Sequence, residues 1–415
     1  MRQEGQLIGL IPTCARKWKR KVVTLTSIKK ENRSILFLIL KKRLKEKEGA
    51  FFMSKYYFSS ESVTSGHPDK VCDLIADSIL DEAIRQDPDA HMAVEATIKD
   101  DLILVYGEAG TTADIDYEKI ALGVMKQIGY DEEYHVQVKV NKQSSEINSA
   151  VAHDEISAGD QGIMFGYADD ETEDLMPFAI DCAHKLAKQL ETVRRQTPFL
   201  RPDGKTQVTA EYVDGKLKRI DTIVVSTQHT ADVSQEEIRK CVMEKVIKPV
   251  VDPKLVDENT KYLINPSGSF ILGGSWGDSG TTGRKIVVDS YGGYAPIGGG
   301  CFSSKDPTKV DRSAAYYARY VCRNVVANGL AHKCQIELAY AIGEPRPMSV
   351  NVQTFGTSKY TNEELLAIIN KNFDFSVSNI IKELDLRRPI YATTTNYGHF
   401  GRAGLPWEAF KKIEL

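Results

Sequence analysis

Residues 71–106, VCDLIADSILDEAIRQDPDAHMAVEATIKDDLILVY, place a helix pattern directly before a hairpin pattern. Apolar residues recur along 71–84 with the period of a helix, and acidic residues occupy the other face. Two strand-like stretches, 93–98 and 102–106, flank the turn-forming segment Lys99-Asp100-Asp101, which predicts a β-hairpin. We therefore expect a fold in which helices and antiparallel strands are combined.

Hairpin and helix patterns recur further along the chain. The dipeptide Asp214-Gly215 is a strong turn signal and predicts a second hairpin around it. The later segments predict, in chain order, a strand, a helix, a helix and two strands: 222–226, 235–246, 313–326, 335–342 and 349–355. Because hairpins and single helices recur three times, the pattern predicts an α+β protein built from three related units.

The composition is that of a globular protein with an acidic body. With 415 residues and 42% hydrophobic residues, the chain is long enough for two or three domains. Its formal net charge of −3 divides into +10 for residues 1–52 and −13 for the rest, which argues against broad nucleic-acid binding. The longest strongly apolar run, 35–40, is far shorter than the roughly 20 residues of a membrane span. We expect a cytoplasmic protein that binds neither nucleic acid nor membrane.

The cysteines give no sign of a metal cluster or a disulfide framework. They are scattered without a C-x-x-C pair, so we expect free thiols in a reducing compartment. The seven positions are Cys14, Cys72, Cys182, Cys241, Cys301, Cys322 and Cys334.

Residues 1–52 lack helical or strand periodicity and do not have the pattern of a signal peptide. Lys47-Glu48-Gly49 can be encoded by a purine-rich stretch that resembles a ribosome-binding site, a few codons before Met53. We therefore expect 1–53 to be an extension that either precedes the true start of the protein or is disordered. N-terminal sequencing or the intact mass of the native protein tests this.

Gly66-His67-Pro68-Asp69-Lys70 precedes the first predicted helix, with Pro at its first position. A helix N-terminus attracts anions, so Asp69 could hold Mg²⁺ while His67 and Lys70 face phosphate oxygens. An ordinary turn with an acid in the first helical turn explains the same residues and stays open.

Further cations are spread over three later segments. Residues 268–300 contain eleven glycines, which allow a backbone to approach a ligand closely, but they match neither a P-loop nor a Rossmann motif. Acidic residues that suit a hard cation, Asp69 and Asp311, accompany these cations. Together they predict a polyphosphate site that includes Lys205, Arg284, Lys285, Lys305 and Lys309.

Eight motifs resemble those of methionine adenosyltransferases, and they occur in family order between Ser59 and Trp407. They are residues 66–70, 159–168, 226–229, 282–285, 289–293, 298–307, 311–315 and 398–402. The resemblance implies three similar α+β domains with mixed sheets and helices on one face, in a pseudo-threefold arrangement. We place them at 54–155, 156–272 and 273–415.

The resemblance also implies the reaction. The sulfur of L-methionine attacks C5′ of ATP, and the whole triphosphate leaves and is hydrolysed to pyrophosphate and phosphate. The product is S-adenosylmethionine. It further implies two Mg²⁺ ions and one K⁺ as cofactors, and a dimer or dimer of dimers with the active site between subunits.

Residue roles carried over from the family cover both substrates and the ions. His67, Lys205 and Arg284 would be catalytic, with His67 near the bond that breaks. Asp69 and Asp311 would hold Mg²⁺, and Glu95 would hold K⁺. The ATP and triphosphate set is His67, Asp203, Lys205, Phe270, Asp278, Arg284, Lys285 and Lys305. The methionine set is Glu108, Gln143, Asp278 and Lys309, and residues 142–153 match a loop that covers the site.

The chain departs from the family at several positions. Ser269 replaces a usual Arg, Ser275 a usual Pro and Thr281 a usual Leu, and Ser145-Glu146 replaces Pro-Asp in the covering loop. We expect the loss of Arg at position 269 to affect adenine recognition more than the binding of the triphosphate. The alternatives are another Mg-dependent ATP-using enzyme or triphosphatase, and a regulatory subunit without activity. Formation of a sulfonium product separates them, and the retained site residues argue against the regulatory subunit.

Overall fold

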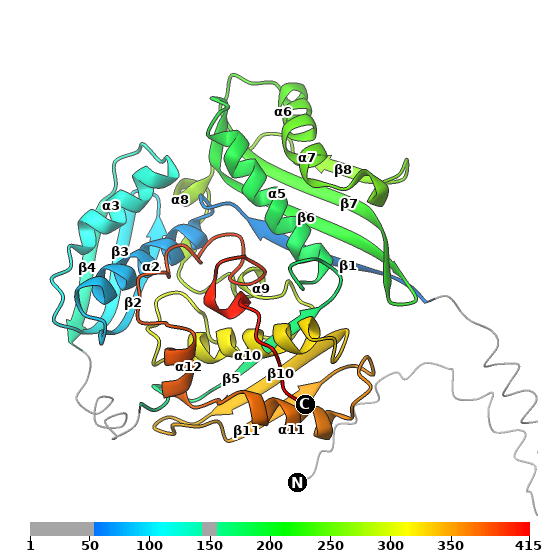
Figure 1. Cartoon of the computed structure of the whole chain (residues 1–415). Helices are drawn as coiled ribbons and strands as arrows, with labels where there is room; N and C mark the ends of the chain where they lie inside the picture. The colour runs from blue at the N-terminus through cyan, green and yellow to red at the C-terminus, as the bar shows by residue number, and fades with distance from the viewer. Residues whose placement is uncertain (1–53, 143–155) are drawn as a thin grey trace, which may run out of the picture. The chain divides into compact units, whose positions relative to one another are not determined.

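A computed structural model describes residues 54–142 and 156–415 of the chain (Figure 1). In these ranges the strands form three sheets, of which two contain both parallel and antiparallel pairs. No helix of the described part is long and apolar enough to cross a membrane. The predicted α+β class with mixed sheets is confirmed.

The first sheet has the order β4-β3-β2-β9 and contains the hairpin predicted at 93–106. Its side chains alternate between buried and half-buried along β2, as expected of a strand covered by helices on one face. The helices α2 and α3 pack on this sheet. The bounds are α2 Pro68–Gln86, β2 His91–Lys99, β3 Leu102–Gly110, α3 Tyr117–Ile128, β4 His135–Lys142 and β9 Gly280–Thr281.

The second sheet has the order β1-β6-β7-β8, and α5 lies along it (Figure 1). The hairpin predicted at Asp214-Gly215 is confirmed: both residues have positive φ, 50° and 76°, as the tight turn between β6 and β7 requires. The bounds are β1 Lys55–Val63, α5 Phe178–Arg194, β6 Leu200–Val213, β7 Lys216–His229, α6 Gln235–Val242, π-helical η3 Met243–Ile247, α7 Lys248–Val250, 3₁₀-helical η4 Pro253–Leu255 and β8 Lys261–Ile264.

The third sheet has the order β11-β10-β5, and α10 covers β5 and β10. The helix and strands predicted between 313 and 355 are confirmed, within a few residues at each end. The glycine-rich segment 268–300 forms only short elements, as its composition predicts. The bounds are β5 Gly162–Asp169, α8 Gly274–Gly277, α9 Ile286–Asp289, α10 Val310–Ala327, β10 Lys333–Tyr340, β11 Ser349–Gln353, α11 Asn362–Asn372, α12 Val377–Glu383 and 3₁₀-helical η5 Pro406–Glu408.

Each sheet contains one strand from a different part of the chain. The strand β1 joins β6, β5 joins β10, and β9 joins β2, so the exchange is cyclic among the three segments. Each sheet contains strands from both sides of at least one of the predicted domain boundaries. The domains 54–155, 156–272 and 273–415 therefore stay a prediction about segments of the chain. The exchange also brings residues from distant segments to the start of α2, where the candidate site lies.

Candidate functional site

The N-terminus of α2 is built as the sequence predicts. His67 is the residue before the helix, and its Nδ1 accepts a hydrogen bond from the backbone N–H of Asp69 at 3.2 Å. Pro68 follows at the first helical position, where its missing N–H costs nothing. His67 and Asp69 are almost wholly buried. The two side chains are therefore held in place by the start of the helix.

Burial and nearby cations keep His67 neutral. Desolvation, followed by the charges of Lys285 and Lys205, lowers the pKa of His67 to about 2. Since Nδ1 accepts the capping hydrogen bond, the ring proton of the neutral form lies on Nε2. In the free protein His67 is therefore a hydrogen-bond donor through Nε2 rather than an imidazolium.

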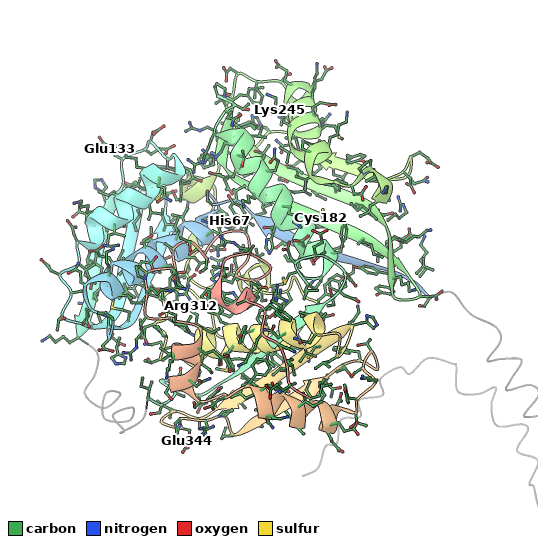
Figure 2. The ribbon with its side chains drawn as sticks, viewed as in Figure 1. His67, Glu133, Cys182, Lys245, Arg312 and Glu344 are labelled. Carbon is green, nitrogen blue, oxygen red and sulfur yellow. The ribbon has the colours of Figure 1, made fainter. Side chains whose placement is uncertain are left out.

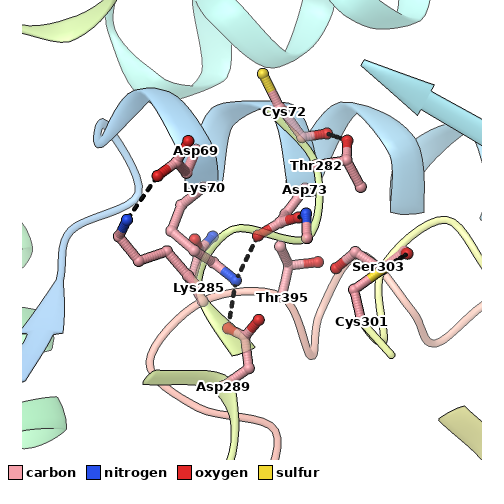
Figure 3. A network of polar contacts seen from close by, with 12 residues as sticks. Asp69, Lys70, Cys72, Asp73, Thr282, Lys285, Asp289, Cys301, Ser303 and Thr395 are labelled. Atoms are coloured by element: carbon pink, nitrogen blue, oxygen red, sulfur yellow. Dashed lines mark hydrogen bonds and ion pairs between the residues drawn. The ribbon is translucent and has the colours of Figure 1, made fainter. Parts of the chain in front are cut away.

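Asp69 brings the glycine-rich segment to the helix (Figure 3). Its carboxylate accepts a hydrogen bond from the N–H of Thr281 at 3.0 Å and forms an ion pair with Lys285 Nζ at 2.5 Å. The Nε of Arg284 lies 3.6 Å from the same carboxylate. A predicted metal ligand and two predicted phosphate ligands thus meet at one place.

Lys70 does not face phosphate oxygens, and that expectation is wrong. Its side chain is buried, and its Nζ lies 2.6 Å from Asp289 and 3.1 Å from Asp73 (Figure 3). Burial lowers the pKa of Lys70, but the two carboxylates more than offset this and raise it. The sequence hid this arrangement because Asp289 is distant in the chain.

Lys305 and Asp311 form a second cluster. Their side chains are joined by a short ion pair. The backbone of Gly300 lies so close that an added Cβ would be 2.3 Å from the carboxyl carbon of Asp311, so only glycine fits there. Glu95 accepts a hydrogen bond from the hydroxyl of Tyr106 at 3.3 Å.

The strand β2 places the two clusters side by side. Ala93 forms a β-bridge with Lys305, and the N–H of Ala96 donates to the hydroxyl of Thr282 at 3.0 Å. Glu95 lies between these contacts on the same strand. Cys301 also contacts Gly283, where an added Cβ would be 2.7 Å from the cysteine Cβ. Cys301 was expected only to be a free thiol.

Asp203 and Phe270 are the two residues that the resemblance predicts beside the adenosine. Asp203 accepts a hydrogen bond from the N–H of Gly274 at 2.9 Å, while its Oδ1 is buried without a partner. Burial raises the pKa of Asp203 to about 6. Phe270 exchanges two hydrogen bonds with His229, each 3.0 Å long. Asp203 therefore links β6 to the N-terminus of α8.

Lys205 and Asp278 also act at long range on His67. Both side chains are exposed. The positive charge of Lys205 lowers the pKa of His67, and the negative charge of Asp278 raises it. Lys205 lies on β6, where it pairs with Val63 of β1, and Asp278 follows the end of α8. Of the predicted catalytic residues, Arg284 contacts the N-terminus of α2 through Asp69, and Lys205 pairs with the strand that precedes it.

The residues predicted to bind methionine are less well defined. Glu108 is exposed on β3 and lies opposite Ala93 in the sheet. Lys309 is engaged by Asp306, with Nζ and Oδ2 2.6 Å apart. Gln143 and the covering loop at 143–153 lie outside the described residues.

The chemistry of the carboxylates fits a hard cation held together with a ligand. In the part of the chain that the structure describes, no three His, Cys, Asp or Glu side chains form a metal cluster. Asp69 and Asp311 each stand as a single carboxylate beside lysines. Mg²⁺ in nucleotide sites commonly takes one or two carboxylates and completes its shell with phosphate oxygens and water. Both positions therefore suit an ion that arrives with a polyphosphate.

The departures from the family are accommodated locally. The hydroxyl of Ser275 donates to the carbonyl of Asp100 at 2.7 Å, and the hydroxyl of Thr281 lies 3.0 Å from that of Thr97. Ser269 is exposed next to Phe270. Two of the three changes therefore add a hydrogen bond at the edge of the site.

Comparison with known proteins extends over nearly the whole described chain. The N-terminal, central and C-terminal domains of S-adenosylmethionine synthetase match residues 55–154, 155–270 and 272–409. The chain belongs to the S-adenosylmethionine synthetase family. Enzymes of this family use metal ions.

Two curated members of this family are similar along almost all of their length. The S-adenosylmethionine synthase of Clostridium tetani is 51% identical over 381 residues, which cover 86% of this chain and 97% of that protein. The enzyme of the same name from Brachyspira hyodysenteriae is 49% identical over 384 residues, covering 88% of this chain and 97% of that protein. The resemblance stated from the motifs is confirmed.

Proposed function

We propose that the chain forms S-adenosylmethionine from ATP and L-methionine where the two clusters meet on β2. The observation that carries this is the meeting of Asp69 with Arg284 and Lys285, directly beside the buried His67. Such a group of cations around one carboxylate suits a leaving group with several negative charges. The reaction itself is inferred from the membership of the chain in the S-adenosylmethionine synthetase family.

The first step needs alignment and charge stabilisation rather than a protein nucleophile. A bond forms between the methionine sulfur and C5′ of ATP while the bond between C5′ and the triphosphate oxygen breaks. His67 would donate from Nε2 toward this oxygen, where negative charge develops. Lys205, Arg284, Lys285 and Lys305 would bind the triphosphate, since fixed charges stabilise a developing anion most in a water-poor site.

The second step is hydrolysis of the bound triphosphate to pyrophosphate and phosphate. Water attacks one terminal phosphorus and a P–O bond breaks. The same cations serve this step, because they already hold the phosphates in one orientation. Arg284, exposed at the rim, would bind the end of the triphosphate that lies toward solvent.

We propose that Asp69 and Asp311 hold two Mg²⁺ ions and that Glu95 holds K⁺. When bound with ATP, the Mg²⁺ ions would neutralise the phosphates. The lysine that now pairs with each aspartate would turn to the phosphates as the ion enters. Glu108, Gln143, Asp278 and Lys309 would contact methionine, and Asp203 and Phe270 would contact the adenosine.

We also propose a dimer or dimer of dimers with the active site at the interface. Ile163, Val287 and Ile297 are 45%, 43% and 39% exposed. Ile163 and Ile297 line the same small cavity as Asp311, so this apolar surface is continuous with the site. Light scattering tests the assembly, and activity of a demonstrably monomeric form would contradict it.

The test of the reaction is a product balance. Purified protein is incubated with ATP, L-methionine, Mg²⁺ and K⁺, and S-adenosylmethionine, pyrophosphate and phosphate are quantified. Equal amounts of the three products are expected. Phosphate together with ADP or AMP, without a sulfonium product, would instead support another ATP-using enzyme.

A further inference from the structure

Four aspartates form a buried stripe on α2. Asp69, Asp73, Asp77 and Asp81 are spaced four residues apart, so they share one helix face. They are 1%, 0%, 0% and 8% exposed. Acidic residues were predicted on the helix face opposite the apolar stripe, and that face is buried too. Burying carboxylates is costly unless each is bound, so their partners explain why they are there.

The four aspartates bind three later segments of the chain, near residues 281–283, 303–312 and 391–395. Asp69 binds the N–H of Thr281, and Asp73 accepts from the N–H of Gly283 at 2.8 Å. Asp81 accepts from the N–H groups of residues 391 and 392, both at 2.9 Å. The stripe therefore aligns several segments along one helix.

Asp77 has the largest set of partners. Its two oxygens lie 2.7 and 2.8 Å from the two terminal nitrogens of Arg312 on α10, so the ion pair is two-pronged. It also accepts from the hydroxyl of Ser303 at 3.0 Å and from the N–H of Ser304 at 3.1 Å. The hydroxyl of Thr395 donates to it at 2.9 Å. Both charged side chains are buried, 0% exposed for Asp77 and 1% for Arg312.

These partners are the chain neighbours of the second cluster. Arg312 follows Asp311 directly, and Ser304 precedes Lys305. Arg312 also donates to the backbone carbonyl of Lys305 at 3.4 Å. The pair of Asp77 and Arg312 thus fixes the backbone on both sides of the ion pair between Lys305 and Asp311. In Figure 2, Arg312 is seen on α10, the helix that carries Asp311.

Ser304 shows that this backbone is held in an unusual conformation. Its φ is +79°, a left-handed value that residues other than glycine adopt at a cost. The hydrogen bond from its N–H to Asp77 helps to maintain it. A strained backbone conformation of this kind is kept only where the surrounding structure fixes the backbone position. A fixed backbone is also what a binding site needs to hold its ligands at set distances.

We propose that Asp77 is a positioning residue. Through Arg312 and the N–H of Ser304 it holds Asp311 and Lys305 at a set distance from Asp69, eight residues before it on α2. The carboxylates that would hold the two Mg²⁺ ions are then spaced for one triphosphate. This inference rests on the proposed function, because it concerns the same carboxylates.

A matched control lies further along α10. Arg319 binds Glu408 through two hydrogen bonds of 3.0 and 2.8 Å, and the two side chains are 0% and 5% exposed, so this pair is buried as well. In the described part of the chain, Glu408 also binds Arg323 and the N–H of Gly401, and neither is a predicted site residue. Loss of either ion pair destabilises the fold, because it leaves a buried arginine without its counter-charge. Only loss of the pair of Asp77 and Arg312 is expected to alter ion binding.

The experiment measures ion binding directly rather than turnover. Mn²⁺ binding is followed by electron paramagnetic resonance with imidotriphosphate, an analogue that is not hydrolysed. The variants are Asp77→Asn, Arg312→Lys and Glu408→Gln, at a temperature where thermal melting shows each folded. Asp77→Asn should weaken the binding of one Mn²⁺ about tenfold or more, and Arg312→Lys should weaken the same ion less.

The outcomes separate the inference from the function it rests on. Glu408→Gln should melt earlier but bind both ions within about twofold of the unaltered protein. Unchanged binding in Asp77→Asn and Arg312→Lys, or an equal loss in Glu408→Gln, would overturn the positioning role alone. If the unaltered protein binds no Mn²⁺ with the analogue, the metal assignment fails and this inference fails with it. If Asp77→Asn does not fold, Arg312→Lys decides the question.

Discussion

Burial changes the ionisation of individual residues around the site. Asp203 and Asp289 are buried, and burial raises the pKa of their carboxyl groups to about 6 and about 7. The same effect on a histidine has the opposite sign and holds His67 neutral. The chemical state of these groups is therefore set by what packs around them, which no local sequence pattern reveals.

His67→Asn should separate catalysis from structure. Asparagine is as good a helix cap as any residue, so α2 should keep its start and the melting temperature should change little. It offers a weaker and differently placed donor to the leaving oxygen, and we expect kcat for sulfonium formation to fall about 100-fold or more. Rapid-quench assay of S-adenosylmethionine measures this. An unchanged kcat would exclude the role of His67.

His184 should make stability depend on pH. Its Nδ1 lies 2.8 Å from the hydroxyl of Ser62, and burial, with Arg402 and Lys70, lowers its pKa to about 3. In the unfolded chain His184 binds a proton near pH 6.5, whereas in the folded chain it stays neutral until about pH 3. The neutral, buried His184 therefore contributes its full stability above pH 6.5, and this contribution is lost as the pH falls below that value.

Comparison with His184→Gln isolates this one group. Between pH 7.5 and pH 5 the unfolding free energy of the unaltered protein should fall by about 2 kcal/mol relative to that of His184→Gln. Urea unfolding at both pH values measures the difference. A difference that does not vary with pH would mean that His184 titrates normally in the folded protein.

Much of the candidate site was predictable at the scale of residues, because charged residues of the right types surround a helix N-terminus. His67, Asp69, Arg284 and Lys285 are brought together as their chemistry suggested. Lys70 was misassigned because its second carboxylate partner comes from a distant segment. The partners of Asp77 were hidden for the same reason, although the spacing of the aspartates on α2 could have been noticed.

At the scale of elements, Gly166 sets how closely β5 approaches α10. A Cβ at this position would lie 2.2 Å from the backbone carbon of Ala318. Gly166→Ala must push the strand from the helix, and we expect a loss of stability of about 3 kcal/mol or more. Gly123→Ala on α3 is the control. Its Cβ would meet nothing within 4 Å, so it should gain about 0.5–1 kcal/mol. Equal melting temperatures for the two variants would contradict this.

Helices and hairpins followed from periodicity and turn residues because these signals are local. The helix α2 and the hairpin at Asp214-Gly215 are examples. The partners of β1, β5 and β9 did not follow, since pairing between distant strands depends on the whole fold rather than on a nearby turn. The three-sheet plan was therefore predictable in kind, but the exchange of strands was not.

For the molecule as a whole, the cyclic exchange of strands predicts one unfolding transition. No sheet in residues 55–142 and 156–415 is complete without a strand from another segment. Calorimetry should therefore give a single peak whose calorimetric and van't Hoff enthalpies agree per cooperative unit. Gly166→Ala should move that whole peak. A separate early peak in this variant would show that the third sheet melts independently.

The exchange of strands also affects how the chain leaves the ribosome. The strand β1, at residues 55–63, cannot pair until residues 205–213 have been synthesised. The strand β5, at 162–169, cannot pair with β10 until residues 333–340 have been synthesised. Until then each presents an unpaired edge that another nascent chain can join. Slower translation lengthens this exposure for β5 more than for β1, because more of the chain separates β5 from its partner. The yield of native enzyme should thus depend on nascent-chain crowding and on chaperones that cover strand edges.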